Sequence, residues 1–243
     1  MTEGSVAVVI PAAGVGRRMG AGRRKQFREL GGAPVLVRTL EAFDRHPAVG
    51  ALVVAGPPGE AAALHDELAT AGFAKLHAVV DGGATRQESV GRGLAASPPD
   101  ADLVLVHDAV RPFLPASRLG AVIAAAREHG AAALAVPMAD TVRRGDDTFG
   151  ATVPRDGLWR MQTPQAFRVD LLREAHERFA DVAGTDEVEL VQRLGRAVRI
   201  VEGSALTFKI TTPDDWALAE ALWPAWENAR KGERENVGEG GGV

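Results

Sequence analysis

The sequence predicts an α/β fold: a doubly wound, mostly parallel twisted sheet with helices on both faces. Six apolar runs of strand length alternate with segments of helical period. The runs are apolar at successive positions, as expected for strands buried on both faces of a parallel sheet. We place the strands at residues 6–10, 51–54, 76–80, 103–106, 132–136 and 198–201, and helical patterns at residues 35–43 and 119–126. In such a sheet, ligands bind beyond the carboxyl ends of the strands.

The chain has 243 residues, a formal net charge of -4 and no cysteine. A chain of this length can form one large α/β domain or two small ones, and it can bury a full core. We expect residues 1–230 to form one domain. The lack of cysteine excludes disulfides and thiolate metal sites, and the net charge does not favour a nucleic-acid surface. No apolar run reaches the ~20 residues that span a bilayer, and no signal peptide is evident. We therefore expect a cytoplasmic protein that binds neither nucleic acid nor membranes.

The loop after the first strand is the most informative segment for function. Residues 11–19 read Pro-Ala-Ala-Gly-Val-Gly-Arg-Arg-Met, and Lys25 follows. Gly14 and Gly16 allow backbone N–H groups to approach an anion without a Cβ atom between them. Arg18 and Lys25 add full positive charges beside those dipoles. The loop therefore favours a polyphosphate such as that of a nucleotide, and a plain strand-to-helix turn with surface cations is the alternative.

Two well-known phosphate loops do not fit this segment. The dinucleotide fingerprint G-x-G-x-x-G requires a glycine where Met19 stands, and an acidic residue at the end of the second strand. The second predicted strand is followed instead by Ala-Gly-Pro. The Walker loop G-x-x-x-x-G-K-[ST] begins at neither Gly14 nor Gly16. An NAD-binding domain is therefore disfavoured.

Polar residues also follow the third predicted strand. The turn Asp81-Gly82-Gly83 opens a helix, with Thr85 and Ser89 near the start of that helix. Exposed N–H groups and a hydroxyl there suit the edge of a nucleobase. N-capping of the helix is an equally good interpretation.

Asp108 and Arg111 stand three residues apart after the fourth predicted strand. An acid and a cation at the carboxyl end of a strand suit a metal or phosphate site, and a buried ion pair is the alternative. The expected crevice lies at this end of the strand, which favours the functional interpretation. We interpret the neighbouring His107 as a structural hydrogen-bonding residue rather than a base.

Other candidates lie in the second half of the chain. Lys209 stands in an apolar, strand-like context and needs an anionic partner. Thr163 and Thr185 are ambiguous, since the acids after Thr185 also fit the first turn of a helix. The tryptophans at positions 216, 223 and 226 are interpreted as packing residues of a C-terminal helix.

One region interrupts the alternation of strands and helices. Residues 141–144 and 149–153 flank Gly-Asp-Asp and predict a β-hairpin, within an arm of about residues 138–162. Because an isolated two-stranded ribbon is marginally stable, we expect the arm to pack against a second subunit. Residues 231–243 are rich in Gly and Glu, and we expect a disordered tail.

Taken together, these segments resemble the family of 2-C-methyl-D-erythritol 4-phosphate cytidylyltransferases of the non-mevalonate isoprenoid pathway. Nine strings recur in family order between residue 6 and about residue 220. They lie at residues 11–19, 25–27, 81–89, 107–112, 140–141, 155–159, 163–165, 185–187 and 209–211. Two departures are small: Arg24 stands where a proline is common, and Val110 replaces a common alanine.

The resemblance implies a Rossmann-like nucleotidyltransferase fold and a role for each matching position. The backbone of the first loop, with the turn after the third strand, would hold cytosine and ribose: Pro11, Ala12, Ala13, Gly14, Gly16, Gly83, Ser89 and Ala109. Arg18 and Lys25 would be catalytic, contacting the CTP phosphates. Mg²⁺ or another divalent cation would be bound by Asp108. The second substrate would be positioned by Asp108, Arg111, Thr141, Arg155, Thr163, Thr185 and Lys209.

In this family the arm reaches across a homodimer, which agrees with the packing expectation. The implied reaction transfers the cytidylyl group of CTP to 2-C-methyl-D-erythritol 4-phosphate and releases pyrophosphate. A cytidylyltransferase for another polyol phosphate, such as ribitol 5-phosphate, is a close alternative. A catalytically dead nucleotide-binding protein is an alternative from another class, although Arg18, Lys25 and Lys209 are all present.

Overall fold

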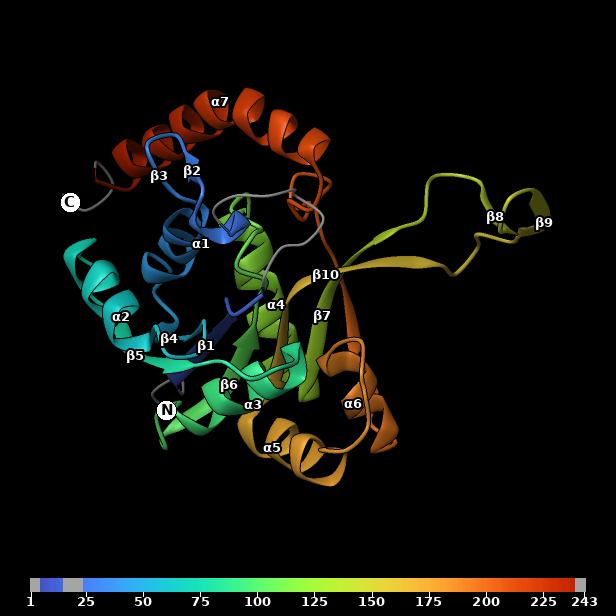
Figure 1. Ribbon diagram of the computed structural model, residues 1–243, viewed down its shortest axis with the longest axis horizontal. Helices are drawn as coiled ribbons and strands as arrows, with labels where there is room; N and C mark the ends of the chain where they lie inside the picture. Colours follow the sequence, from blue (N-terminus) through green and yellow to red (C-terminus); the bar gives the residue numbers. More distant parts are fainter. Residues whose placement is uncertain (1–4, 15–23, 239–243) are drawn as a thin grey trace.

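A computed structural model describes residues 5–14 and 24–238, the last eight as backbone alone. Its centre is a seven-stranded sheet with the order β11-β7-β10-β6-β1-β4-β5 (Figure 1). All neighbouring strands are parallel except β10, which runs antiparallel to β6 and β7. The doubly wound, mostly parallel sheet predicted from the sequence is confirmed.

The strands of this sheet are β1 (Ser5–Pro11), β4 (Val49–Gly56), β5 (Leu76–Asp81), β6 (Ala101–Val106), β7 (Ala131–Pro137), β10 (Trp159–Arg168) and β11 (Arg199–Glu202). The helices are α1 (Val35–Asp44), α2 (Ala61–Thr70), α3 (Arg86–Ala95), α4 (Ala116–His129), α5 (Val169–Arg178), α6 (Glu187–Arg193) and α7 (Pro213–Gly238). A short 3-10 helix, η2 (Lys25–Phe27), precedes the two-residue strands β2 (Glu29–Leu30) and β3 (Ala33–Pro34).

Side-chain alternation along β1 explains why helices cover both faces. Val6, Val8 and Ile10 pack in one core cluster with residues of α1, α2 and α4. Ala7 and Val9 point to the opposite face and pack with residues of α3, α5 and α6. Both clusters are buried, so each strand residue contributes apolar area to one of the two layers.

Strand β10 was not predicted from the sequence. Pro164 has no N–H to donate to a ladder, and a proline within a run argues against a central strand. The pairing of β10 with β7 shifts register between Met161 and Gln165, so the proline lies in the irregular part of the ladder. This arrangement brings Thr163 to the carboxyl end of β6, since Gln165 pairs with Val106.

The predicted hairpin is present as β8 (Val142–Gly145) and β9 (Phe149–Val153). These strands pair with each other and form a separate two-stranded sheet. Figure 1 shows that the hairpin projects well away from the central sheet. Phe149 at its tip is 90% exposed, which leaves an apolar side chain without cover from the described part of the chain.

Helix α7 lies along one side of the molecule, beside β2 and β3 (Figure 1). Trp216 and Trp223 are buried there with Phe113, and Trp226 packs at the edge of the same cluster. The interpretation of these tryptophans as packing residues is confirmed. Within the described residues, no helix has the length and apolar character needed to cross a membrane.

The sequence predicts a disordered tail from residue 231, whereas helix α7 continues to Gly238. The prediction relied on the lack of regularly spaced apolar residues in this segment. That lack argues against a buried helix face but not against a helix. Glu, Lys and Arg are good helix formers, and this stretch contains no proline. Residues 239–243 lie outside the described residues.

Candidate functional site

A cavity of about 520 Å³ opens at the carboxyl ends of β1, β5 and β6, where the fold predicts a ligand. Its volume is in the range of small-molecule sites. Several segments far apart in sequence line it: residues 11–14, 25–26, 58, 83–86, 89, 108–110, 209 and 211. The first loop, the turn after β5, Asp108 and Lys209 are therefore brought together as the sequence predicts.

The first loop forms one wall of the cavity. Ala12 donates its N–H to the Ala55 carbonyl of β4 at 2.7 Å, which continues the pairing beyond the strand end. A Cβ atom built on Gly14 meets no described atom within 4 Å. Protein packing therefore does not require a glycine at this position, and a side chain would occupy the space of the cavity.

The turn after β5 forms the opposite wall. A Cβ atom on Gly82 would lie 2.5 Å from the Ala13 Cβ and 2.8 Å from the Gly56 carbonyl oxygen. Only glycine permits this close approach of two loops. The Ser89 hydroxyl accepts the Gly83 N–H at 3.1 Å and donates to the Thr85 carbonyl at 2.8 Å.

The N-capping interpretation of this turn is confirmed, because Thr85 accepts the N–H of Glu88 at 3.0 Å. Asp81 serves another helix: its carboxylate accepts the Gly59 and Ala61 N–H groups at 2.9 and 3.2 Å. Ser89 still lines the cavity, so capping and ligand contact are compatible at this turn.

Asp108 is the acidic side chain at the floor of the cavity. Its Oδ2 atom lies 3.0 Å from the Arg111 Nε and 3.1 Å from the Lys209 Nζ. Its Oδ1 atom lies 3.6 Å from the Arg86 Nε. Asp108 and Arg111 form a buried ion pair, which confirms that interpretation. Asp108 also lines the cavity, so a metal or phosphate site there stays a prediction.

The cations around Asp108 decide its charge. Burial alone would raise the pKa of the Asp108 carboxyl, but the positive charges of Lys209, Arg111 and Arg86 outweigh burial and hold the pKa well below its usual range. The carboxylate is therefore ionised at neutral pH. Lys209 has the anionic partner that its apolar surroundings require.

His107 and Thr163 lie next to Asp108 and do not line the cavity. The Thr163 hydroxyl accepts the Asp108 N–H at 3.0 Å and lies 3.0 Å from the His107 Nδ1. The His107 Nε2 lies 3.1 Å from the Arg111 carbonyl oxygen. Burial lowers the pKa of His107 to about 4, so its ring is neutral at pH 7. His107 is a structural hydrogen-bonding residue, as the sequence interpretation held.

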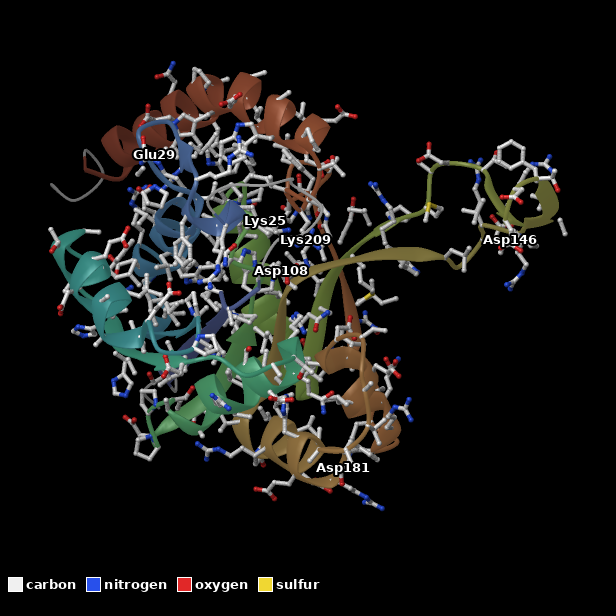
Figure 2. The ribbon with its side chains drawn as sticks, viewed as in Figure 1. Lys25, Glu29, Asp108, Asp146, Asp181 and Lys209 are labelled. Carbon is white, nitrogen blue, oxygen red and sulfur yellow. The ribbon has the colours of Figure 1, made fainter. Side chains whose placement is uncertain are left out.

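Lys25 approaches the same point from η2. Its Nζ atom donates to the Ile210 carbonyl at 3.0 Å, next to Lys209. Figure 2 shows Lys25, Lys209 and Asp108 close together in the middle of the molecule. With Arg86, the cavity presents three cations and one carboxylate from described residues, which suits a polyanion.

Some predicted residues do not line this cavity. Thr163 and Arg111 lie behind Asp108. Thr185 is exposed, and its hydroxyl donates to the Glu189 carboxylate at 2.9 Å. Thr141 and Arg155 lie on the arm side of the molecule, where Arg155 donates to the Ala139 carbonyl. Gly16 and Arg18 lie outside the described residues.

Three residues at the site were given no role from the sequence: Gln26, Arg86 and Glu187. Gln26 is 3% exposed and contacts the first loop. Arg86 lines the cavity and pairs with the buried Glu187 at 2.7 Å. A glutamine directly after Lys25 and an acid at the start of a helix carry little signal alone, because their partners are set by the tertiary fold.

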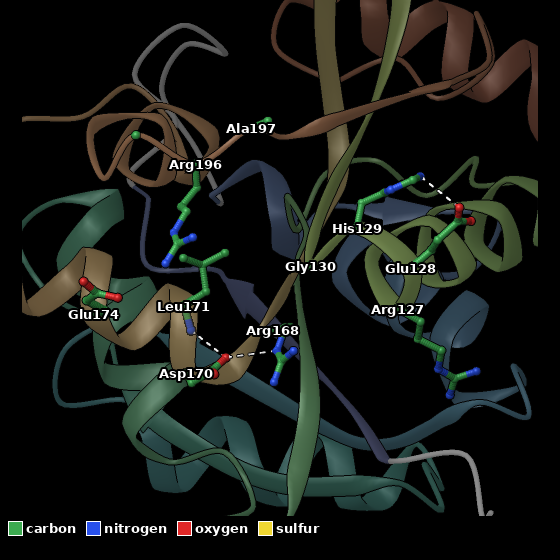
Figure 3. A pocket seen from close by; sticks show the side chains of 11 residues that line it. Arg127, Glu128, His129, Gly130, Arg168, Asp170, Leu171, Glu174, Arg196 and Ala197 are labelled. Atoms are coloured by element: carbon green, nitrogen blue, oxygen red, sulfur yellow. Dashed lines mark hydrogen bonds and ion pairs between the residues drawn. The ribbon is translucent and has the colours of Figure 1, made fainter.

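A second cavity, of about 680 Å³, lies between α4, α5 and the segment after α6 (Figure 3). Two pairs of its charged side chains lie close together: His129 lies 3.6 Å from Glu128, and Arg168 lies 3.4 Å from Asp170. It is formed at the opposite ends of the strands, where β7 begins and β10 ends. None of the predicted site residues that the structure describes lines it.

The geometry of the first cavity therefore suits binding and charge neutralisation rather than proton transfer. Among the described residues, no group of three histidine, aspartate or glutamate side chains forms a metal cluster. His107 is buried behind the cavity, and Asp108 is held by cations. Positioned cations next to backbone N–H groups are typical of sites that stabilise phosphoryl transition states.

Comparisons with known proteins agree with this geometry. A sequence model of the family IspD, 2-C-methyl-D-erythritol 4-phosphate cytidylyltransferase, matches residues 6–224. A Salinibacter ruber protein named 2-C-methyl-D-erythritol 4-phosphate cytidylyltransferase is 57% identical over 227 residues, which cover 92% of this chain and 95% of that protein.

Two solved structures have the same fold. A 4-diphosphocytidyl-2C-methyl-D-erythritol synthase is 35% identical with a TM-score of 0.78, and the match covers 91% of this chain and 99% of that one. The 2-C-methyl-D-erythritol 4-phosphate cytidylyltransferase from Thermus thermophilus is 40% identical with a TM-score of 0.75, over 90% and 98% of the two chains.

Proposed function

The chain belongs to the 2-C-methyl-D-erythritol 4-phosphate cytidylyltransferase family, and we propose that it transfers the cytidylyl group of CTP to 2-C-methyl-D-erythritol 4-phosphate. The products are 4-diphosphocytidyl-2-C-methyl-D-erythritol and pyrophosphate. One observation carries the proposal at the level of the site: Lys25, Lys209 and Asp108, from three distant segments, meet in the cavity at the carboxyl ends of the strands.

The reaction needs no general base. An oxygen of the 4-phosphate bonds to the α-phosphorus of CTP, the bond between that phosphorus and the bridging oxygen breaks, and pyrophosphate leaves with the electron pair. A phosphate oxygen is already ionised at neutral pH. The barrier is electrostatic, because two polyanions meet and the α-phosphate gains negative charge.

The residues of this chain would lower that barrier by position and charge. The first loop and the turn at Gly83 would receive the nucleoside, with Ser89 shaping that turn. Lys25 would contact the CTP phosphates, and Arg18 is expected to do the same from outside the described residues. Lys209, held by Asp108, would attract the polyol phosphate, and Arg111 would position the Asp108 carboxylate. Holding both substrates in line replaces a bimolecular encounter by an oriented one.

We propose Mg²⁺ as the cofactor. Magnesium sites commonly use one or two carboxylates and complete the shell with substrate phosphates and water. Asp108 fits this pattern, since it is an ionised carboxylate at the cavity floor whose Oδ1 has a single, longer ion pair at 3.6 Å. The ion would supply charge neutralisation at the phosphate oxygens. Loss of turnover in a chelator, and its return on adding Mg²⁺, tests this assignment.

We also propose a homodimer in which the arm of one protomer reaches the cavity of the other. The support is the distance of Thr141 and Arg155 from the cavity of their own chain, and the exposed Phe149 at the arm tip. Trp159 and Met161 at the base of the arm are also partly exposed. Sedimentation of the purified protein tests the assembly, and a monomer at micromolar concentration would contradict it.

Turnover with purified protein tests the reaction. The protein is incubated with CTP, Mg²⁺ and either 2-C-methyl-D-erythritol 4-phosphate or ribitol 5-phosphate, and pyrophosphate release is followed together with the mass of the nucleotide product. We expect faster turnover with the methylerythritol phosphate. Faster turnover with ribitol 5-phosphate would assign another polyol, and no turnover with either would favour a nucleotide-binding protein without activity. The cytoplasmic location stays a prediction.

A further inference from the structure

One buried side chain joins the two segments that carry the predicted catalytic cations. Gln26 is 3% exposed, and its Nε2 atom donates to the Ala12 carbonyl at 2.6 Å and to the Gly14 carbonyl at 2.8 Å. Both partners are backbone oxygens, which only accept, so the atom that faces them must be the NH₂ group of the amide. The orientation of the Gln26 amide is therefore fixed by chemistry.

Gln26 itself is anchored on both sides. Phe27 packs in the same core cluster as Ala12. Arg28 accepts the Val35 N–H on its carbonyl at 2.9 Å, and its guanidinium stacks 4.1 Å over the Trp216 ring. On the other side, Lys25 donates to the Ile210 carbonyl. The amide thus extends from a segment held by the core and by the start of α7.

The two hydrogen bonds restrain the shape of the first loop. In a planar trans peptide the C=O and N–H groups point in opposite directions. Holding the Ala12 carbonyl on Gln26 therefore fixes the direction of the Ala13 N–H, and the second bond holds the peptide after Gly14. The Ala12 N–H is already bonded to Ala55. Without the Gln26 amide, the Ala12 and Gly14 carbonyls would both lose the side-chain hydrogen bond that the structure gives them.

We propose that Gln26 is a positioning residue for nucleotide binding, because its amide fixes the Ala12 and Gly14 carbonyls and so presets the loop for CTP. The proposal rests on the proposed function, since it assumes that CTP occupies this cavity. A loop that is already ordered binds its ligand more tightly than a loop that must first order itself. Gln26 acts through the loop and is not assigned a contact with CTP.

The test is CTP binding, measured by isothermal titration calorimetry of the whole protein with Mg²⁺ present. Gln26→Met keeps the length and volume of the side chain and removes the donor. We expect its Kd for CTP to rise about 10-fold or more, since two hydrogen bonds are lost. The KM for the polyol phosphate should stay within about twofold of wild type, because that substrate does not contact the loop.

Gln87→Met is the matched control. The Gln87 amide also ties a loop together, donating to the Phe179 carbonyl at 2.9 Å and accepting the Gly184 N–H at 3.1 Å, away from the first loop. We expect Gln87→Met to lose thermal stability and keep the CTP Kd. An equal rise in Kd in both variants, or an unchanged Kd in folded Gln26→Met, overturns the proposal.

A second variant covers the case in which Gln26→Met does not fold. Gln26→Asn keeps an amide that is one methylene shorter, and we expect it to fold and to bind CTP with intermediate affinity. If Gln26→Asn is unfolded as well, the amide serves stability alone and the proposal falls. If the wild-type protein neither binds nor turns over CTP, the proposed function fails first and this inference fails with it.

Discussion

Arg86 Nη1 lies 2.7 Å from Glu187 Oε2, and these two residues tie α3 to α6 beside the cavity. The Glu187 side chain is 1% exposed, while Arg86 reaches the cavity and its Nε lies 3.6 Å from Asp108. Asp186 caps α6 by accepting the Glu189 N–H at 3.0 Å. The cap fixes the start of α6, and Glu187 in its first turn then holds Arg86 toward the cavity floor.

Glu187→Gln is expected to destabilise the protein. The substitution keeps the shape of the side chain but leaves the half-buried Arg86 without its closest counter-charge. Loss of one partner of a fully buried pair costs about 3 kcal/mol or more, and about 1–2 kcal/mol is expected here because Arg86 keeps contact with water and with Asp108. Urea unfolding followed by circular dichroism measures the loss. Glu128→Gln is the control, since the Glu128 side chain is 75% exposed and little change is expected there. Equal midpoints for the two variants would show that the Arg86–Glu187 pair does not stabilise the fold.

The Arg86–Glu187 pair also shows where prediction from sequence ends. Strand β1 was predictable because a short run of consecutive apolar residues is buried on both faces in a parallel sheet. The meeting of Asp108 with the first loop followed from the fold class, because parallel strands end at one edge. The pairing of Arg86 with a residue 101 positions away could be predicted neither from an apolar run nor from the fold class. The same holds for Gln26, whose partners depend on how η2 returns to the loop.

Strand β10 marks another limit. Local chemistry argued against a strand at Pro164, and the register shift that accommodates the proline forms only when β6 and β7 flank it. The Thr163 hydroxyl joins His107 to the Asp108 backbone, a contact that its motif did not predict. The motifs thus named residues that the fold brings near one cavity, but not the protein groups that each side chain contacts.

Lys25→Ala and Arg155→Ala test whether the sites are shared between protomers. Lys25→Ala alone should lower kcat about 10²–10³-fold, the usual cost of one preorganised charge in a transition state. Arg155→Ala should mainly raise the KM for the polyol phosphate. In a fully exchanged equal mixture of the two proteins, half of the dimers contain one of each chain. In these, the intact Lys25 meets the partner subunit's Arg155 in one of two sites. At a polyol phosphate concentration well below the KM of Arg155→Ala, activity should therefore return to about a quarter of wild type.

Pyrophosphate release at matched total protein, before and after subunit exchange, measures this recovery. Single-variant samples treated in the same way are the controls. If the mixture gives no more than the sum of its two components, both residues act within one chain, and the arm does not reach the partner's cavity.

Gly31→Ala tests the contact between the β2–β3 turn and α7. Gly31 has φ +59°, and a Cβ atom there would lie 1.8 Å from the Nε1 of Trp223, which is 5% exposed. The neighbouring Gly32 has φ +81° and no described atom within 4 Å of its Cβ position. Both alanine variants carry the left-handed backbone cost of about 1 kcal/mol, and Gly31→Ala should lose about 1–3 kcal/mol more through overpacking.

Thermal unfolding of the two glycine variants separates the cost of the left-handed backbone from the cost of overpacking. The Tm of Gly31→Ala should fall clearly below that of Gly32→Ala, and its tryptophan emission should shift to the red as Trp223 moves toward solvent. Equal Tm values would mean that α7 can shift away from the turn without loss of packing.

His107 gives the fold a pH dependence with a defined sign. Burial lowers the pKa of its ring from 6.5 to about 4 in the folded protein, so the unfolded chain binds a proton at higher pH than the folded one. Stability therefore falls as the pH drops from about 6.5 to 4, by about 3 kcal/mol in total for this group. Asp108 acts with the same sign at lower pH: its pKa is depressed, so its contribution is lost as the pH falls below the ordinary carboxyl pKa of about 4.

Urea unfolding at a series of pH values between 7 and 4.5 isolates this histidine when wild type is compared with His107→Gln. The amide can replace one ring hydrogen bond without titrating, so the variant should be less stable at pH 7 and lose less stability on acidification. His65→Gln removes a ring whose side chain is 51% exposed and should leave the wild-type slope unchanged. If His107→Gln retains the full slope, the acid sensitivity arises from other groups, and the neutral His107 is not the residue that links folding to pH in this range.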